Sequence, residues 1–219
     1  MVCSQIARDF VTRLLFWRGM RIYYIHGFNS YKGSSTPKKL RQALGMDVHE
    51  LYYESQKTFE EIMIGLQAQY KTSNVAHEPA VIAGTSMGGF FADQLCDMPD
   101  VMAVVMINPV VDPVEVLSKE TFLGEQENFI THEKYMFSKA IAETYGSYRD
   151  MRKIDVRRFL MLAAHDELLD ASVSEAYWGG CARVIRLEGG HRLTEFGAVA
   201  RILASLIPED DAPNERYAG

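Results

Sequence analysis

The segment AVIAGTSMGGFF, residues 80–91, decides the fold. Its first four residues, Ala80–Ala83, form an apolar stretch that favours a buried strand. The turn GTSMG (84–88) follows, and a helical stretch runs from Met87 to Cys96, ending before Pro99. A G-x-S-x-G sequence between a strand and a helix is typical of a nucleophile elbow, in which a sharp turn lifts the serine hydroxyl above a sheet. The two outer glycines fit because larger side chains would clash there.

Apolar strands and helical segments alternate on both sides of this turn. A helix is expected with Thr36 as its N-cap, Pro37 first and Gly45 at its end, and a second helix begins with a capping box of Thr58 and Glu61. Such alternation predicts βαβ units and a parallel sheet with both faces covered. The fold class is therefore α/β, a three-layer αβα core around a mostly parallel six-stranded sheet. The other strands are expected at residues 21–26, 48–53, 101–107, 158–163 and 182–187.

The chain divides into one main domain and three smaller segments. Residues 20–207 form the domain, and residues 113–151, which are rich in charge and weakly helical, form a small helical cap inserted in it. Residues 1–19 are expected to form an amphipathic helix or to precede a true start at Met20. Residues 208–219 are expected to be a flexible acidic tail.

Composition excludes several classes of protein. The 219 residues are 47% apolar and 24% charged, as in ordinary globular domains. A net charge of -6 opposes a phosphate backbone, so nucleic-acid binding is not expected. No stretch approaches the roughly 18 apolar residues of a membrane span, so an integral membrane protein is not expected. Cys3, Cys96 and Cys181 are too widely spaced for a zinc site, and their odd number favours a reducing cytoplasm.

Ser86 is the candidate nucleophile. A serine hydroxyl needs a neighbouring base held by a third group, and with this elbow the partners follow in the order acid, then histidine. Asp166 follows the strand at 158–163, and His191 follows the strand at 182–187. Both loops are expected at the same sheet edge as Ser86, because the carboxyl ends of parallel strands meet there. Glu167 is a rival acid within reach of the histidine, whereas Asp170 is better placed to stabilise the next helix.

An oxyanion-binding site is expected at the same edge. The Met87 amide begins a helix, where its N–H and the helix dipole face developing negative charge. The second donor should be an amide in HGFNS (26–30), after the first strand, and we assign it to Phe28. Gly27 and Asn29 are expected to bind substrate, with holding the loop as the alternative for Asn29, and His26 is expected to be a buried, hydrogen-bonded side chain.

Several spaced motifs resemble the YqiA-type esterases, a small bacterial branch of the α/β-hydrolase superfamily. The resemblance covers about residues 20–206 and implies an α/β-hydrolase core and ester hydrolysis through Ser86, Asp166 and His191. It also implies that Asn108, with Pro109, shapes the wall of the pocket and contributes to substrate binding. The motifs are HGFNS (26–30), GTSMGG (84–89), INPVVDP (107–113), LGEQEN (123–128), HDELLD (165–170) and EGGH (188–191).

Two positions depart from the pattern of that group. His165 stands where the group commonly has glycine, and the loop Gly189-Gly190-His191 is one residue shorter than Gly-Gly-Asn-His. An ungapped alignment would place Arg192 at the histidine position, but arginine stays charged and cannot act as a general base. The assignment of His191 therefore requires a one-residue deletion.

The sequence thus predicts a carboxylesterase-type serine hydrolase that acts on a small-molecule ester with short to medium acyl chains and needs no metal or organic cofactor. Phe28, Met87, Phe90 and Phe122 are candidates for the lining of an open pocket, with ordinary core packing as the alternative for each. One alternative is an acyl-CoA thioesterase, whose nucleotide phosphates would meet Lys32, Lys38 and Lys39. The other is a non-catalytic ligand-binding protein, suggested by the altered histidine loop.

Overall fold

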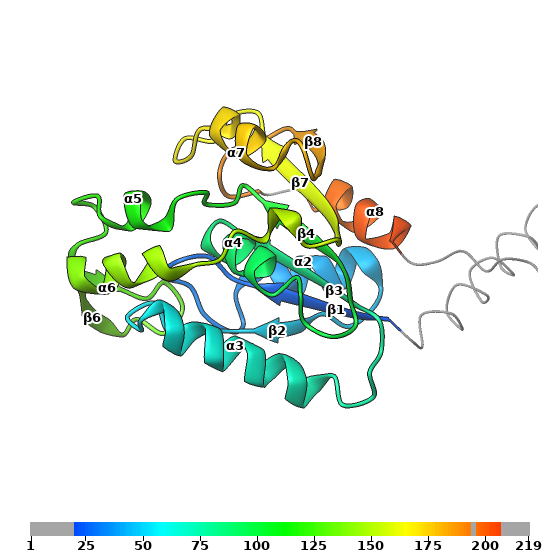
Figure 1. Cartoon of the computed structure of the whole chain (residues 1–219), viewed down its shortest axis with the longest axis horizontal. Helices are drawn as coiled ribbons and strands as arrows, with labels where there is room; N and C mark the ends of the chain where they lie inside the picture. Colours follow the sequence, from blue (N-terminus) through cyan, green and yellow to red (C-terminus); the bar gives the residue numbers. More distant parts are fainter. Residues whose placement is uncertain (1–19, 194–195, 207–219) are drawn as a thin grey trace, which may run out of the picture.

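The computed structural model describes residues 20–193 and 196–206 (Figure 1). The expectations for residues 1–19 and for the tail at 208–219 lie outside the described residues. All of the predicted core strands fall within the described part, so the predicted architecture can be compared with the structure element by element.

A six-stranded parallel sheet forms the centre of the molecule, in the order β2-β1-β3-β4-β7-β8. This confirms the predicted fold class. The strand at 101–107 has the predicted bounds, and the others differ by a few residues at their ends. The strands are β1 (Arg21–Ile25), β2 (His49–Leu51), β3 (Ala80–Thr85), β4 (Val101–Ile107), β7 (Arg157–Ala163) and β8 (Arg183–Leu187).

Helices cover both faces of the sheet because apolar side chains point to alternate sides along each strand. In β1, Ile22 and Tyr24 pack toward α2 (Ser35–Leu44) and α8 (Gly197–Ser205). Tyr23 and Ile25 pack on the opposite side, which α3 (Phe59–Ser73) and α4 (Met87–Gln94) cover together with α7 (Ala171–Trp178). None of the helices in the described ranges is long and apolar enough to cross a membrane.

The helix ends follow the capping signals with one exception. Thr58 and Glu61 form the predicted capping box, and Gly45 ends α2 in the left-handed conformation with φ 68°. The predicted N-cap at Thr36 is wrong, because α2 begins after Ser34 and Thr36 lies in its first turn. Pro37 is tolerated there because the first N–H groups of a helix have no partner within the helix.

The insert at 113–151 contains a hairpin as well as helices. Its strands β5 (Gly124–Glu127) and β6 (Lys134–Phe137) pair antiparallel. The purely helical description of the insert was incomplete, because the polar GEQE strand lacks the apolar alternation that reveals a strand. In Figure 1 the insert gathers at the left end of the molecule. Its helical parts are α5 (Pro113–Leu117), α6 (Lys139–Thr144) and η2 (Tyr145–Ser147), and η3 (Met151–Lys153) begins where the insert ends.

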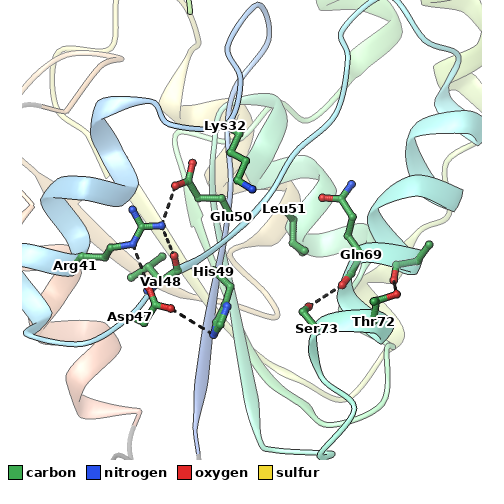
Figure 2. Close-up of a pocket in the computed structure, with 11 residues that line it drawn as sticks. Lys32, Arg41, Asp47, Val48, His49, Glu50, Leu51, Gln69, Thr72 and Ser73 are labelled. Atoms are coloured by element: carbon green, nitrogen blue, oxygen red, sulfur yellow. Dashed lines mark hydrogen bonds and ion pairs between the residues drawn. The ribbon is translucent and has the colours of Figure 1, made fainter.

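The β2 edge of the sheet borders a cavity of about 700 Å³ between α2 and α3 (Figure 2). Side chains from both helices bind main-chain groups at the ends of this strand. Arg41 donates to the Val48 carbonyl at 2.7 Å. Gln69 both accepts from the Tyr52 N–H, at 3.1 Å, and donates to the Tyr52 carbonyl, at 2.8 Å. None of the three candidate catalytic side chains lines this cavity.

Candidate active site

Ser86 lies at a strained turn between β3 and α4. Its φ of 58° and ψ of -122° place a non-glycine residue in a rarely populated conformation, which persists only when the surrounding structure holds it. The Ser86 N–H donates to the Ile107 carbonyl at 2.9 Å, which fixes the turn to the end of β4. A Cβ on Gly84 would overlap the backbone of Gly88, and one on Gly88 would overlap the Ile25 carbonyl. The predicted need for glycine at both positions is confirmed.

His191 and Asp166 form a buried pair. His191 Nδ1 lies 2.8 Å from Asp166 Oδ2 and 3.0 Å from Oδ1, and the two side chains are 8% and 3% exposed. Asp166 Oδ1 also accepts the N–H groups of Leu168 and Leu169, both at 2.9 Å. These bonds fix the carboxylate, and the carboxylate in turn holds the imidazole through Nδ1. Nε2 is therefore the ring nitrogen that is left for another partner.

The two rival acids have other partners. Glu167 accepts the main-chain N–H of His191 at 2.9 Å. This hydrogen bond lowers the pKa of Glu167. Asp170 caps α7 by accepting the Ser172 N–H at 2.8 Å, as the sequence indicated. The Arg192 guanidinium lies 5.0 Å above the ring of Phe129. His191, and not Arg192, therefore contacts Asp166.

Ser86 and His191 are connected through the end of β4. Among the hydrogen bonds of the described residues, none joins Ser86 Oγ to the imidazole, and such bonds often tighten only when substrate binds. The Ser86 main chain binds Ile107, and the next residue, Asn108, donates from Nδ2 to the His191 carbonyl at 3.1 Å. Both loops are thus tied to adjacent residues of one strand end.

Asn108 has no side-chain group left over for substrate. It is 2% exposed and has a φ of 42°. Its Oδ1 accepts the Ala163 N–H at 2.8 Å, and its Nδ2 donates to the His191 loop. The side chain of Asn108, which was expected to bind substrate, instead connects the loop after β4 to the end of β7 and to the loop after β8.

The loop after β1 lies against the elbow. A Cβ on Gly27 would lie 3.4 Å from Ser86 Cβ, so this glycine permits close approach. The Phe28 and Met87 amides donate no hydrogen bond to any described residue. The Met87 side chain is buried in the core, and that of Phe28 packs edge-on against Phe122 at 5.4 Å.

His26 is a buried structural residue, as predicted. Its ring stacks on Tyr53 with centroids 4.4 Å apart and an interplanar angle of 12°. Nδ1 lies 2.8 Å from the Gly27 carbonyl, and Nε2 accepts the Tyr53 N–H at 3.3 Å. Burial lowers the pKa of His26 to about 4, so the ring is neutral at pH 7.

Asn29 connects the loop after β1 to the β5–β6 hairpin. Its Nδ2 donates to Gln126 Oε1 at 2.9 Å, and its Oδ1 accepts the Tyr135 hydroxyl. The Asn29 carbonyl accepts the Phe129 N–H at 2.7 Å. Asn29 is only 5% exposed, so this network is a structural attachment and its side chain does not face an open pocket.

Sequence reasoning did not find the contributions of Tyr135 and Gln126. No local pattern marks them, because their partner Asn29 is about a hundred residues away in the chain. The LGEQEN motif contains Gln126 and was the one signal in this region. Within 20–193 and 196–206, no group of three or more His, Cys, Asp or Glu side chains is arranged to hold a metal ion.

Solved structures share this fold. The chain matches Est1E from Butyrivibrio proteoclasticus with a TM-score of 0.67 and 14% identity over 86% of each chain. It matches the esterase domain of a Rhodothermus marinus protein with a TM-score of 0.63 and 17% identity, covering 86% of this chain and 85% of that one. A Paleococcus ferrophilus monoacylglycerol lipase matches with a TM-score of 0.60 and 15% identity, covering 87% of this chain and 94% of that one. The fold is that of the α/β-hydrolases.

A narrower assignment comes from the sequence. Residues 21–207 match the uncharacterised protein family UPF0227, and the chain belongs to that family. This match confirms the predicted resemblance to the YqiA-type esterases. A comparison with curated proteins finds no match.

Proposed function

We propose that this protein is a serine hydrolase that cleaves carboxylic esters of short to medium acyl chains. The observation that carries the proposal is the buried contact of His191 Nδ1 with both oxygens of Asp166. The strained elbow at Ser86, tied to the same end of the sheet, supports it. The fold shared with proteins named as esterases and a lipase supports the hydrolase class.

The proposed reaction has two halves. Ser86 Oγ attacks the acyl carbonyl while His191 Nε2 takes its proton, and Asp166 stabilises the imidazolium that forms. The tetrahedral intermediate collapses when His191 returns that proton to the departing alcohol, leaving an acyl-serine. Water then attacks the acyl group with the same proton transfers, which releases the acid and regenerates Ser86.

The amides of Phe28 and Met87 are proposed to bind the oxyanion. Met87 is the first residue of α4, where a free N–H and the helix dipole both favour negative charge. One such donor contributes about 3 kcal/mol to the transition state. The ring of Phe28 lies edge-on to those of Phe122 and Phe137, with centroids 5.4 and 5.1 Å apart, and we take this aromatic packing next to the Phe28 amide as support for a limited acyl length.

A fluorophosphonate probe tests the nucleophile. We expect labelling of the full-length chain that is lost in Ser86→Ala and retained in Ser205→Ala, a substitution at an exposed helical serine. Turnover of an activated ester should fall by about 10⁴ or more in Ser86→Ala. Absence of labelling in the unaltered chain would instead indicate the non-catalytic binding protein.

A substrate panel tests the leaving group and acyl length. Oxygen esters and thioesters of the same graded acyl chains should be compared by kcat/KM. We expect the oxygen esters with short or medium chains to be preferred. Lys32 and Lys39 already lie 5.6 Å and 5.8 Å above the rings of Tyr52 and Phe196, so phosphate recognition would have to displace contacts within the chain. A consistent preference for acyl-CoA would favour the thioesterase.

A further inference from the structure

The main chain of His191 is held on both sides. Its N–H donates to Glu167 Oε2 at 2.9 Å, and its carbonyl accepts from Asn108 Nδ2 at 3.1 Å. Asn108 Nδ2 also lies 3.5 Å from the Gly190 carbonyl. Because the ring separately contacts Asp166, three different side chains determine where this one residue lies.

Gly190 provides the space for the Glu167 carboxylate. A Cβ at this position would lie 2.6 Å from Glu167 Oε2 and 3.4 Å from the His165 carbonyl. Gly189 has a φ of 115°, which an L side chain rarely adopts. Its carbonyl accepts the His165 N–H at 3.0 Å. The double glycine therefore lets the histidine loop lie directly against the acid loop.

Asn108 makes the connection from the opposite side. Its Oδ1 is fixed by the Ala163 N–H at the end of β7, and its own N–H donates to the Met161 carbonyl at 2.9 Å. An amide held this firmly presents Nδ2 in one direction only, toward the His191 loop. Through Asn108, the ends of β4 and β7 therefore determine where the main chain of His191 lies.

We infer that Glu167 and Asn108 are positioning residues that fix the main chain of His191, so that a Gly-Gly-His loop places the imidazole between Asp166 and Ser86. The inference rests on the proposed function, in which His191 is the general base. Neither residue is assigned contact with substrate. Their effect should therefore appear in kcat and in the rate at which Ser86 reacts with a fluorophosphonate, with little change in KM.

The decisive comparison uses Glu167→Ala, Glu167→Gln and Glu188→Ala in the full-length chain. Glu167→Ala removes a charge-assisted hydrogen bond, and we expect this to lower kcat by about tenfold. Glu167→Gln keeps an acceptor oxygen and should restore most of that loss. Glu188 is a matched control in the neighbouring loop, with a 94% exposed side chain, and Glu188→Ala should leave kcat unchanged.

A double-mutant cycle shows whether Glu167 acts through the histidine. In the His191→Ala background, Glu167→Ala should cause no further loss. An additive loss, or equal losses in Glu167→Ala and Glu167→Gln, would overturn the inference, as would wild-type kcat in Glu167→Ala. Full activity of His191→Ala would contradict the proposed function itself, so the two failures are distinguishable.

Asn108→Asp provides a second variant on the opposite side of the loop. It keeps an oxygen for the Ala163 N–H and replaces the donor that faces the His191 carbonyl. We expect kcat to fall by about tenfold or more while the variant retains a cooperative thermal transition. Unchanged kcat in this variant would remove Asn108 from the proposal.

Discussion

His191 Nδ1 lies within 3.0 Å of both carboxylate oxygens of Asp166, although the two residues follow different strands and are 25 positions apart. The carboxylate therefore selects the tautomer that carries its proton on Nδ1, which leaves Nε2 free to accept one. This division of roles between the two ring nitrogens is what a general base beside a serine requires.

Asp166→Asn should lower kcat for an activated ester by about 10⁴, because an amide can stabilise the wrong tautomer of His191. Steady-state hydrolysis at pH 7 measures this loss. Asp170→Asn is the matched control in the same loop, since asparagine also caps a helix and α7 should be preserved. Comparable activity in Asp166→Asn and Asp170→Asn would remove Asp166 from the triad.

Tyr135→Phe tests whether the insert supports the loop after β1, which carries the Phe28 amide proposed to bind the oxyanion. Loss of the hydroxyl leaves Asn29 Oδ1 without this donor, so the loop that carries the Phe28 amide should shift. We expect kcat to fall by about tenfold with a smaller change in KM, as for a contact that matters in the transition state. Lys134→Ala alters an exposed ion pair in the same strand and serves as the control. If kcat is the same in Tyr135→Phe and Lys134→Ala, the Tyr135 hydroxyl does not support the loop.

His26 should make the protein less stable at mildly acidic pH. Its folded-state pKa of about 4 is below the ordinary value of 6.5, so the unfolded chain binds the proton more readily. Stability from this group is present above pH 6.5 and is lost as the pH falls toward 4. The free energy of unfolding should decrease by about 2 kcal/mol between pH 7 and pH 5.

Urea unfolding at several pH values measures the contribution of His26. His26→Asn should flatten the pH dependence, and His77→Asn, at a histidine with a 76% exposed side chain, is the surface control. If the free energy of unfolding of His26→Asn changes with pH as steeply as that of the unaltered chain, groups other than His26 cause the pH dependence.

Asp93 in α4 and Arg158 in β7 form a buried ion pair, with side chains only 3% and 1% exposed. Arg158 Nε donates to Asp93 Oδ1 at 2.9 Å, and Trp178 Nε1 donates to Oδ2 at 3.1 Å. Asp93→Ala should destabilise the fold by about 3–5 kcal/mol, because Arg158 would remain charged and buried without its carboxylate.

Thermal and chemical unfolding of Asp93→Ala and Asp97→Ala would test this difference. Asp97 pairs with Arg149 at 2.8 Å on the surface, where such a pair contributes about 0–1 kcal/mol. If Asp93→Ala lowers the free energy of unfolding no more than Asp97→Ala does, other groups compensate the buried charge of Arg158.

Local patterns predicted the elbow and the order of the candidate triad. The turn at Ser86 could be predicted because a strand, small residues and a helix are consecutive in the chain. The loops with Asp166 and His191 could be predicted because strand order places them at one sheet edge. The Asn108 contacts could not be predicted, since they join groups 55 and 83 residues apart and depend on a particular side-chain direction.

The β2 edge has a consequence for association between molecules. The Val48 carbonyl and both hydrogen-bonding groups of Tyr52 are already bound by Arg41 and Gln69. An extended segment of another chain would have to break these contacts before it could continue the sheet. These contacts should therefore hinder pairing of this edge with a second molecule, and light scattering of a concentrated solution should show faster aggregation for Gln69→Ala than for the unaltered chain.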